Sequence, residues 1–296
     1  MSSPAIKAST TSETQHDGDV TSIVLHNDHL YSAGADGKIW DLDFNLKREV
    51  VVHEAQAYIY SIVVDQKGRM YTSSCDGTIK CVANPLTSDE HSVILEHENE
   101  VEAIFIDENS QFYCGDSKGG VTCFENGKFK YTINIVENVK SLYIEKALVY
   151  TILNNDLSVH EVKENGKYYM KVSIPGRFPV TLFGDKTDGR SKYLAILTRD
   201  GRGITIVKNG LDEKFQTHTV KENLHEMIVN ALNGRGDVLF SCDYAGRVMK
   251  SQVEGNSLNE IANITTGAGC ANCIAVKDEN LIFVGNGDGS IKKIAF

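Results

Sequence analysis

Short apolar segments separated by tight turns recur along the whole chain. One such unit, LYSAGADGKIWDLD, starts at Leu30, and another, MYTSSCDGTIKCVA, starts at Met70. Each unit reads as a short strand, a tight turn and a second short strand, because short apolar runs lie on both sides of turn-forming residues. Further copies start at Phe112, Tyr193, Leu239 and Ile282, and a weaker copy starts at Val149. The chain is therefore predicted to be built from repeats.

An Asp-Gly pair marks the turn in four of these units. Asp-Gly is a common sequence for a type I′ hairpin turn, which requires positive φ, so we expect the pairs to form structural hairpin turns. The first and the last pair are six repeats apart, which gives a period of about 42 residues. The pairs are Asp36-Gly37, Asp76-Gly77, Asp200-Gly201 and Asp288-Gly289.

Two further strands belong to each repeat. Ahead of the hairpin lies a segment with apolar residues at i, i+3 and i+5, such as Val20, Ile23 and Leu25, and after it an Asn-containing turn leads into a fourth strand. Seven repeats of four antiparallel strands are typical of a β-propeller, in which no blade buries both of its faces alone. We therefore predict an all-β fold, a single seven-bladed β-propeller domain over residues 1–296. Its blades are predicted to start near residues 19, 57, 99, 137, 177, 226 and 269.

The two ends of the chain are predicted to close the ring. The last repeat stops at Phe296 on its third strand, so its outer strand is missing. Residues 4–11, PAIKASTT, have the length of a strand and precede the first repeat. We expect residues 1–18 to supply the outer strand of the last blade, which leaves no strand edge unpaired where the ring closes.

The hairpin sequences SAGADGKIW and SSCDGTIK resemble the strand–turn–strand core of WD-repeat proteins, and the resemblance extends over nearly the whole chain. His16 and His97 echo the Gly-His element of that family, without its glycine. Trp40 lies two residues before the position that the family gives to its tryptophan, which is Leu42 here. The resemblance implies a divergent WD40-like seven-bladed propeller. The shifted tryptophan leads us to expect that the family's Asp–His–Ser–Trp hydrogen-bond network is absent.

The composition is that of an ordinary globular protein with an acidic balance. Of its 296 residues, 30 are Lys or Arg and 40 are Asp or Glu, for a formal net charge of −10. General nucleic-acid binding depends on a basic surface, so we expect no nucleic-acid partner. The N-terminus lacks the pattern of a secretory signal, and no apolar run approaches the about 18 residues of a spanning helix, so we expect no membrane insertion. The seven cysteines lack framework spacing, which favours free thiols and residence in the cytoplasm or the nucleus.

No motif in the chain indicates catalysis, a metal site or a cofactor. The four His-Glu pairs lack the second histidine of a zinc protease. Residues 184–191 resemble a phosphate-binding loop with Arg in place of Lys, but a strand follows instead of the required helix, which favours a plain hairpin loop. Cys270 and Cys273 form a lone CxxC pair. On a strand their side chains point to opposite faces, so we expect structural thiols.

Charge is distributed unevenly along the chain. Residues 86–110 carry eight acidic side chains and no Lys or Arg, whereas residues 177–210 carry seven basic side chains and three acidic ones. These charges belong either to ordinary solvated surfaces or to a polarised docking surface, since separated unlike charges orient a partner. In a propeller, the turn between the second and third strands shares a face with the loop that leads into a blade. The predicted contact residues on this face are Arg199 and Arg202 at the blade-five turn and Glu98 and Glu100 before blade three.

The resemblance to WD-repeat proteins implies function by binding rather than by catalysis. It suggests a rigid platform that holds proteins or peptides, either as a monomer or as a subunit of a complex. The alternative is a propeller enzyme that hydrolyses a small ester with a metal ion in the central channel. This alternative requires several carboxylates to converge at the mouth of the channel.

Overall fold

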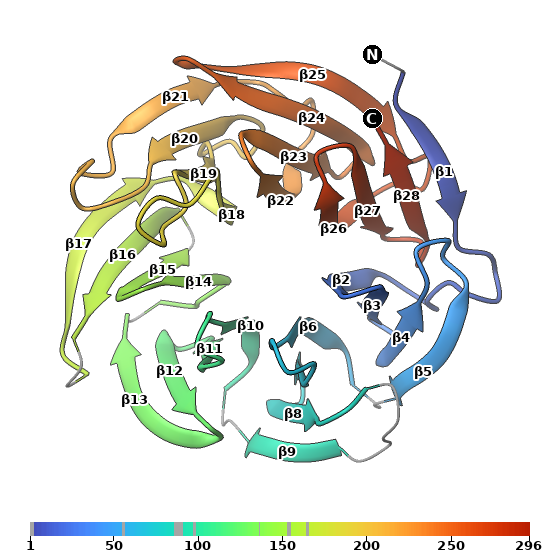
Figure 1. Ribbon diagram of the computed structural model, residues 1–296, viewed down its shortest axis with the longest axis horizontal. Helices are drawn as coiled ribbons and strands as arrows, with labels where there is room; N and C mark the ends of the chain where they lie inside the picture. The colour runs from blue at the N-terminus through green and yellow to red at the C-terminus, as the bar shows by residue number, and fades with distance from the viewer. Residues whose placement is uncertain are drawn as a thin grey trace.

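The strands of the protein form seven four-stranded antiparallel sheets arranged in a ring, which confirms the predicted seven-bladed β-propeller (Figure 1). The computed structural model describes residues 3–54, 57–85, 91–96, 99–135, 137–152, 155–163 and 166–296. Within these ranges there is no helix with the length and apolar character needed to cross a membrane. The strands of a blade are named a, b, c and d from the centre of the ring to its rim, and the connections ab, bc and cd accordingly.

Six blades are runs of four consecutive strands, and the seventh combines both ends of the chain. Blade one comprises β2 (Val20–His26), β3 (His29–Gly34), β4 (Lys38–Leu42) and β5 (Arg48–Glu54). Blade two comprises β6 (Ile59–Val64), β7 (Met70–Ser74), β8 (Thr78–Val82) and β9 (His91–Glu96). Blade three comprises β10 (Val101–Ile106), β11 (Phe112–Asp116), β12 (Gly120–Glu125) and β13 (Lys128–Asn134). Blade four comprises β14 (Ser141–Glu145), β15 (Leu148–Ile152), β16 (Asp156–Val162) and β17 (Tyr168–Pro175).

The remaining blades complete the ring. Blade five comprises β18 (Arg177–Phe183), β19 (Tyr193–Leu197), β20 (Ile204–Lys208) and β21 (Thr217–Lys221). Blade six comprises β22 (Val229–Arg235), β23 (Val238–Asp243), β24 (Arg247–Glu254) and β25 (Ser257–Thr265). Blade seven comprises β26 (Ala271–Asp278), β27 (Leu281–Asn286), β28 (Ile291–Ala295) and the N-terminal β1 (Ala5–Ser9).

A β-bulge near the start of strand a explains the i, i+3 spacing of its apolar residues. In a regular strand, residues three positions apart point to opposite faces. The register of β2 against β3 shifts between Val20 and Ser22, so one extra residue is accommodated there. As a result, Val20 and Ile23 are buried in the same hydrophobic cluster. Similar shifts occur at the start of β6, β10, β18, β22 and β26, so the spacing identifies the innermost strand of a blade.

The Asp-Gly hairpins differ from the predicted type I′ turn. Gly37 has a φ of 76°, but Asp36 does not have positive φ, and the Gly37 amide donates to the Gly34 carbonyl (3.1 Å). This geometry is a type I turn followed by a left-handed glycine in a three-residue loop. The Asp36 carboxylate instead accepts a hydrogen bond from the Lys38 amide (3.1 Å). Asp76, Asp200 and Asp288 likewise accept from the amide two residues later, and Gly77, Gly201 and Gly289 have positive φ.

The hydrophobic core lies between the blades rather than inside any one of them. The described residues form seven buried clusters, and each cluster combines side chains of two neighbouring blades. In the cluster that closes the ring, Val20 and Leu30 of blade one pack with Phe283 and Ile291 of blade seven. A blade therefore depends on both of its neighbours to remove its apolar faces from water.

The N-terminal strand completes blade seven, as predicted. β1 pairs antiparallel with β28, with Ala5 opposite Ala295 (Figure 1). Beyond the strand, the Thr10 amide donates to the Ile291 carbonyl (3.0 Å), and the Thr10 hydroxyl accepts from the Ile291 amide (2.9 Å). The first residues of the chain thus satisfy the outer backbone groups of its last strand.

Deleting residues 1–12 should lower the melting temperature clearly and cause aggregation, because it removes β1 and exposes the hydrogen-bonding edge of β28. Thermal unfolding and size-exclusion chromatography measure both effects. Lys7→Ala is the control, since it keeps the strand and changes only an exposed side chain. An unchanged melting temperature together with monomeric elution of the truncated protein would contradict the closure role of β1.

Candidate functional site

The bc turns and the loops between successive blades lie on one face of the ring, here called the bc face. In blade two, the Cys75 amide of the bc turn donates to the Tyr58 carbonyl of the loop before β6 (2.9 Å). In blade three, the Ser117 amide donates to the Glu100 carbonyl in the same way (2.9 Å). The ab and cd loops consequently lie on the other face, here called the ab face.

The predicted contact residues on the bc face lie in separate sectors. Arg199 and Arg202 are exposed on the bc turn of blade five, and Glu100 is exposed in the loop before blade three. Glu98 lies outside the described residues. The Arg202 guanidinium donates to Asp200 (3.3 Å), and hydrogen bonds from the Thr198 hydroxyl and the Arg202 amide lower the pKa of Asp200. The two arginines lie at blade five and Glu100 lies before blade three, so they occupy separate sectors of this face.

Exposed apolar side chains surround the blade-five turn. The Gly201 carbonyl accepts from the Val229 amide (2.9 Å), and the Ile228 carbonyl accepts from the Tyr244 amide (3.1 Å). A Cβ at Gly201 would lie 3.1 Å from Ile228 and 3.5 Å from Arg177, so both side chains border the turn. The apolar side chains of Met227, Ile228 and Tyr244 are exposed, and the exposed fraction reaches 54% at Tyr244. We define the blade-five/six patch as Arg177, Arg199, Arg202, Met227, Ile228 and Tyr244.

A buried hydrogen-bond network fixes the blade-six side of this patch. His225 precedes β22, and its Nδ1 lies 2.8 Å from Asp243 Oδ2, while its Nε2 lies 2.7 Å from Ser241 Oγ. Burial raises the pKa of Asp243, but hydrogen bonds from His225 and from backbone amides outweigh this effect and lower it. The network ties the loop that carries Ile228 to the turn that carries Tyr244.

A second Asp–His–Ser network lies in blade one, so the expected absence of the family network is correct for its tryptophan arm and wrong for its other three members. His16 Nδ1 lies 2.9 Å from Asp36 Oδ1, and His16 Nε2 lies 2.9 Å from Ser32 Oγ. The tryptophan arm of the family network does not form, since Trp40 Nε1 has no hydrogen-bond partner among the described residues. The Trp40 ring lies 5.3 Å from the His16 ring, which places it beside the network but not in it.

The acidic sector before blade three contains aromatic side chains as well. The rings of Tyr58 and Tyr60 are 5.2 Å apart, and Tyr58 is exposed. Burial and the charge of nearby Glu100 raise the pKa of Tyr60. This sector therefore presents phenol groups and a carboxylate to solvent on the same face as the blade-five/six patch.

The central channel is lined by strand a of every blade and has a volume of about 340 Å³. Among its lining side chains in the described part of the chain, Glu102 is the carboxylate. It accepts a hydrogen bond from Asn138 (3.0 Å) and pairs with Lys140 (3.6 Å). The described residues also hold no group of three or more His, Cys, Asp or Glu side chains arranged for a metal ion. They therefore do not supply the carboxylate cluster that a channel hydrolase requires.

The two thiols of the CxxC pair contact different neighbours. Cys270 lies just before β26, and its sulfur accepts a hydrogen bond from the Asn230 side chain of blade six (2.9 Å). Cys273 faces the Val20 carbonyl of blade one (3.7 Å). Burial raises the pKa of Cys273 to about 12, so this thiol stays protonated at neutral pH. Both cysteines are free thiols that pack between blades.

Solved structures share this architecture at low sequence identity. The WD40 β-propeller domain of Doa1 superposes with a TM-score of 0.78 and 16% identity, over 100% of this chain and 97% of that one. The computationally designed protein Ika8 superposes with a TM-score of 0.70 and 13% identity, over 95% of this chain and 98% of that one. Comparison with protein-family models and with curated protein sequences gives no match. The similarities show the fold, a propeller of the WD40 kind, and they leave function to the surface of this chain.

Asp243→Ala should lower the free energy of unfolding at pH 7 by about 1–3 kcal/mol, since it leaves buried donors without their acceptor. The pKa of Asp243 is lower in the folded state, so its contribution is present above the unfolded value of about 3.9 and is lost as pH falls through the folded value. The difference between wild type and variant should therefore shrink below about pH 4.

Urea unfolding of both proteins between pH 7 and pH 2 measures this difference. Asp237→Ala, which removes an exposed aspartate of the same blade, is the control and should change stability little. Equal stability of wild type and Asp243→Ala at pH 7, or a difference that does not depend on pH, would contradict the role of the network.

Proposed function

We propose that the protein is a non-catalytic interaction platform that holds a protein or peptide partner on the bc face, at the blade-five/six patch. The observation that carries the proposal is the exposure of Met227, Ile228 and Tyr244 around a turn that bears two arginines. Aromatic residues, Met and Arg are the side chains enriched at protein interfaces, and Tyr and Arg dominate their binding energy. Scattered exposed apolar residues are ordinary, but a group beside arginines on one rigid face supports docking.

The charge of the patch indicates the chemistry of its partner. Arg199 and Arg202 favour an acidic segment, and the apolar side chains favour a segment that also carries one or two hydrophobic anchors. Glu100 and its neighbouring tyrosines lie in another sector of the same face, where they favour a basic group of the same partner. Unlike charges in separate sectors set the orientation and the association rate of a complex more than its affinity.

Two further observations agree with this proposal. The fold is shared with a WD40 domain, an architecture that supports binding surfaces, although this is an argument by analogy. The seven cysteines are free thiols, which supports a reducing compartment such as the cytoplasm or the nucleus.

Arg199→Glu combined with Arg202→Glu should slow association with the partner about tenfold at low salt and weaken its salt dependence. The melting temperature should not change, because exposed charges contribute little to stability. Affinity capture by the immobilised wild-type protein, with mass spectrometry, identifies the partner, and surface plasmon resonance then measures its rates. Tyr244→Ala should mainly increase the dissociation rate, since it removes an apolar contact.

The matched control reverses the same number of charges on the ab face. Lys186 and Lys214 are exposed there, and Lys186→Glu with Lys214→Glu should leave association unchanged. If the ab-face variant loses the partner while the Arg199/Arg202 variant binds normally, the docking face is assigned to the wrong side of the ring.

A further inference from the structure

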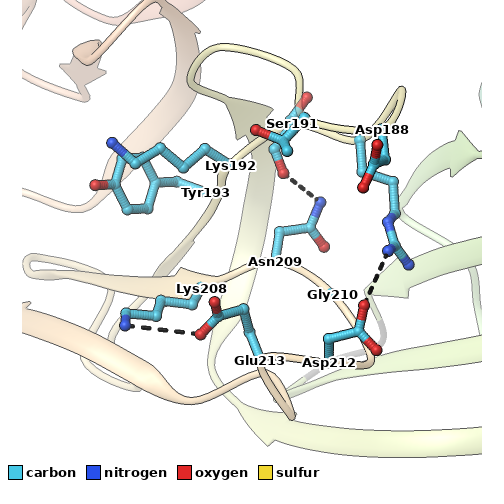
Figure 2. A pocket seen from close by; sticks show the side chains of 11 residues that line it. Asp188, Ser191, Lys192, Tyr193, Lys208, Asn209, Gly210, Asp212 and Glu213 are labelled. Carbon is cyan, nitrogen blue, oxygen red and sulfur yellow. Dashed lines mark hydrogen bonds and ion pairs between the residues drawn. The ribbon is translucent and has the colours of Figure 1, made fainter.

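A pocket of about 300 Å³ opens on the ab face of blade five (Figure 2). It lies between the ab loop, residues 184–192, and the cd loop, residues 209–216, which are both long for this propeller. The volume is at the lower end of the range for small-molecule sites, about 300–1,000 Å³. The pocket is on the face opposite to the blade-five/six patch, so it is independent of the proposed docking function.

A buried network from blade four holds the floor of this pocket. The Asn209 amide group donates to the Ser191 carbonyl (2.9 Å) and to Glu145 (3.1 Å), and its oxygen accepts from the Tyr150 hydroxyl (2.8 Å). The Ser191 amide and hydroxyl also donate to Glu145, at 3.0 Å and 2.6 Å. All four residues are buried. The two loops are therefore positioned before any ligand arrives, which reduces the entropy cost of binding.

Two neighbouring acidic residues of the cd loop form ion pairs with two basic residues of the pocket. Asp212 lies 3.7 Å from Arg190, and Glu213 lies 3.7 Å from Lys208, on opposite sides of Asn209 in Figure 2. These distances exceed the about 2.7–2.9 Å of strong charge-assisted hydrogen bonds. The Asp212 side chain is 95% exposed, whereas that of Arg190 is only 22% exposed. The acids are thus weakly held and solvated, while the Arg190 guanidinium is largely enclosed.

We propose that this pocket binds a small ligand with two anionic groups, phosphates or carboxylates, which replace Asp212 and Glu213 on Arg190 and Lys208. Displacing Asp212 and Glu213 costs little, because both carboxylates are solvated and ion pairs with solvated partners contribute little. The planar guanidinium of Arg190 matches a phosphate or a carboxylate with two parallel hydrogen bonds.

A third cation in the lining supports the same ligand chemistry. Lys192 also lines the pocket, with its ammonium 4.8 Å from the centre of the Tyr193 ring and 3.7 Å from Asp237 of blade six. Once the two loop acids move aside, Asp188 is the acid left among the lining residues, against three cations.

Isothermal titration calorimetry of the full chain with pyrophosphate and with glutarate at low salt tests the proposal. The probe with the lower Kd identifies the preferred anionic group, and inorganic phosphate should bind at least about tenfold more weakly than pyrophosphate. Arg190→Ala with Lys208→Ala should weaken binding by at least about tenfold. Asp212→Asn with Glu213→Gln should strengthen binding several-fold, because it removes the internal competitor.

Lys214→Ala is the matched control, since Lys214 is an exposed cation of the same cd loop and lies outside the lining of this pocket. Its Kd should equal that of wild type. The gain expected for the Asp212/Glu213 variant keeps the test valid even if the Arg190/Lys208 variant folds poorly. The proposal would be overturned if neither probe gave a heat of binding with the wild-type protein or with the Asp212/Glu213 variant. Equal affinity for phosphate and pyrophosphate, or an equal loss of affinity in the Lys214→Ala control, would overturn it too.

Discussion

The packing of each blade against both of its neighbours is the constraint on which the whole structure depends. Every buried hydrophobic cluster of the described chain is shared by two blades, so no blade is stable as an isolated sheet. A ring has no end blade, provided that its two ends meet. The pairing of β1 with β28 and the cluster around Val20 and Phe283 satisfy this condition together, one through backbone hydrogen bonds and one through apolar contact. The N-terminal residues are therefore needed to close the ring.

Hydrogen bonds between the interblade loops and the bc turns make the bc face rigid. The loop before a blade donates or accepts backbone hydrogen bonds at the bc turn beside it, and in blades one and six a buried histidine links the two. His225 does this directly beneath the exposed Ile228 and Tyr244. Apolar side chains that lie on such a fixed support lose little conformational entropy when a partner covers them. The patch therefore combines exposure with preorganisation, which a flexible loop does not offer.

The sequence predicts the repeats well because their signals are local. The bulge after Val20 requires an i, i+3 spacing of the apolar residues in strand a. Each Asp-Gly turn requires a glycine in the left-handed conformation. Contacts between segments that are far apart in the sequence leave a weaker signal in it. The shifted Trp40 argues against the family network in the sequence, yet His16 needs only Asp36 and Ser32, which the hairpin supplies. For the apolar part of the patch, the sequence contains one local signal, which is Tyr244 at a turn position where small residues are usual. The pocket floor joins residues of blades four and five, and no local sequence signal marks it.

The basic segment 177–210 shows how the fold redistributes charge that looks continuous in the sequence. The chain crosses blade five three times within this segment, so its basic residues reach both faces of the ring. Arg199 and Arg202 lie on the bc face beside apolar side chains, whereas Arg190 and Lys208 lie on the ab face beside the acids of the cd loop. A single run of positive charge thereby becomes two cation sets with different surroundings. The apolar neighbours suit the first set to a protein surface, and the enclosed pocket suits the second to a small anion. The buried apolar side chains of strands β19 and β20 lie between the two sets and keep them on separate faces of the ring.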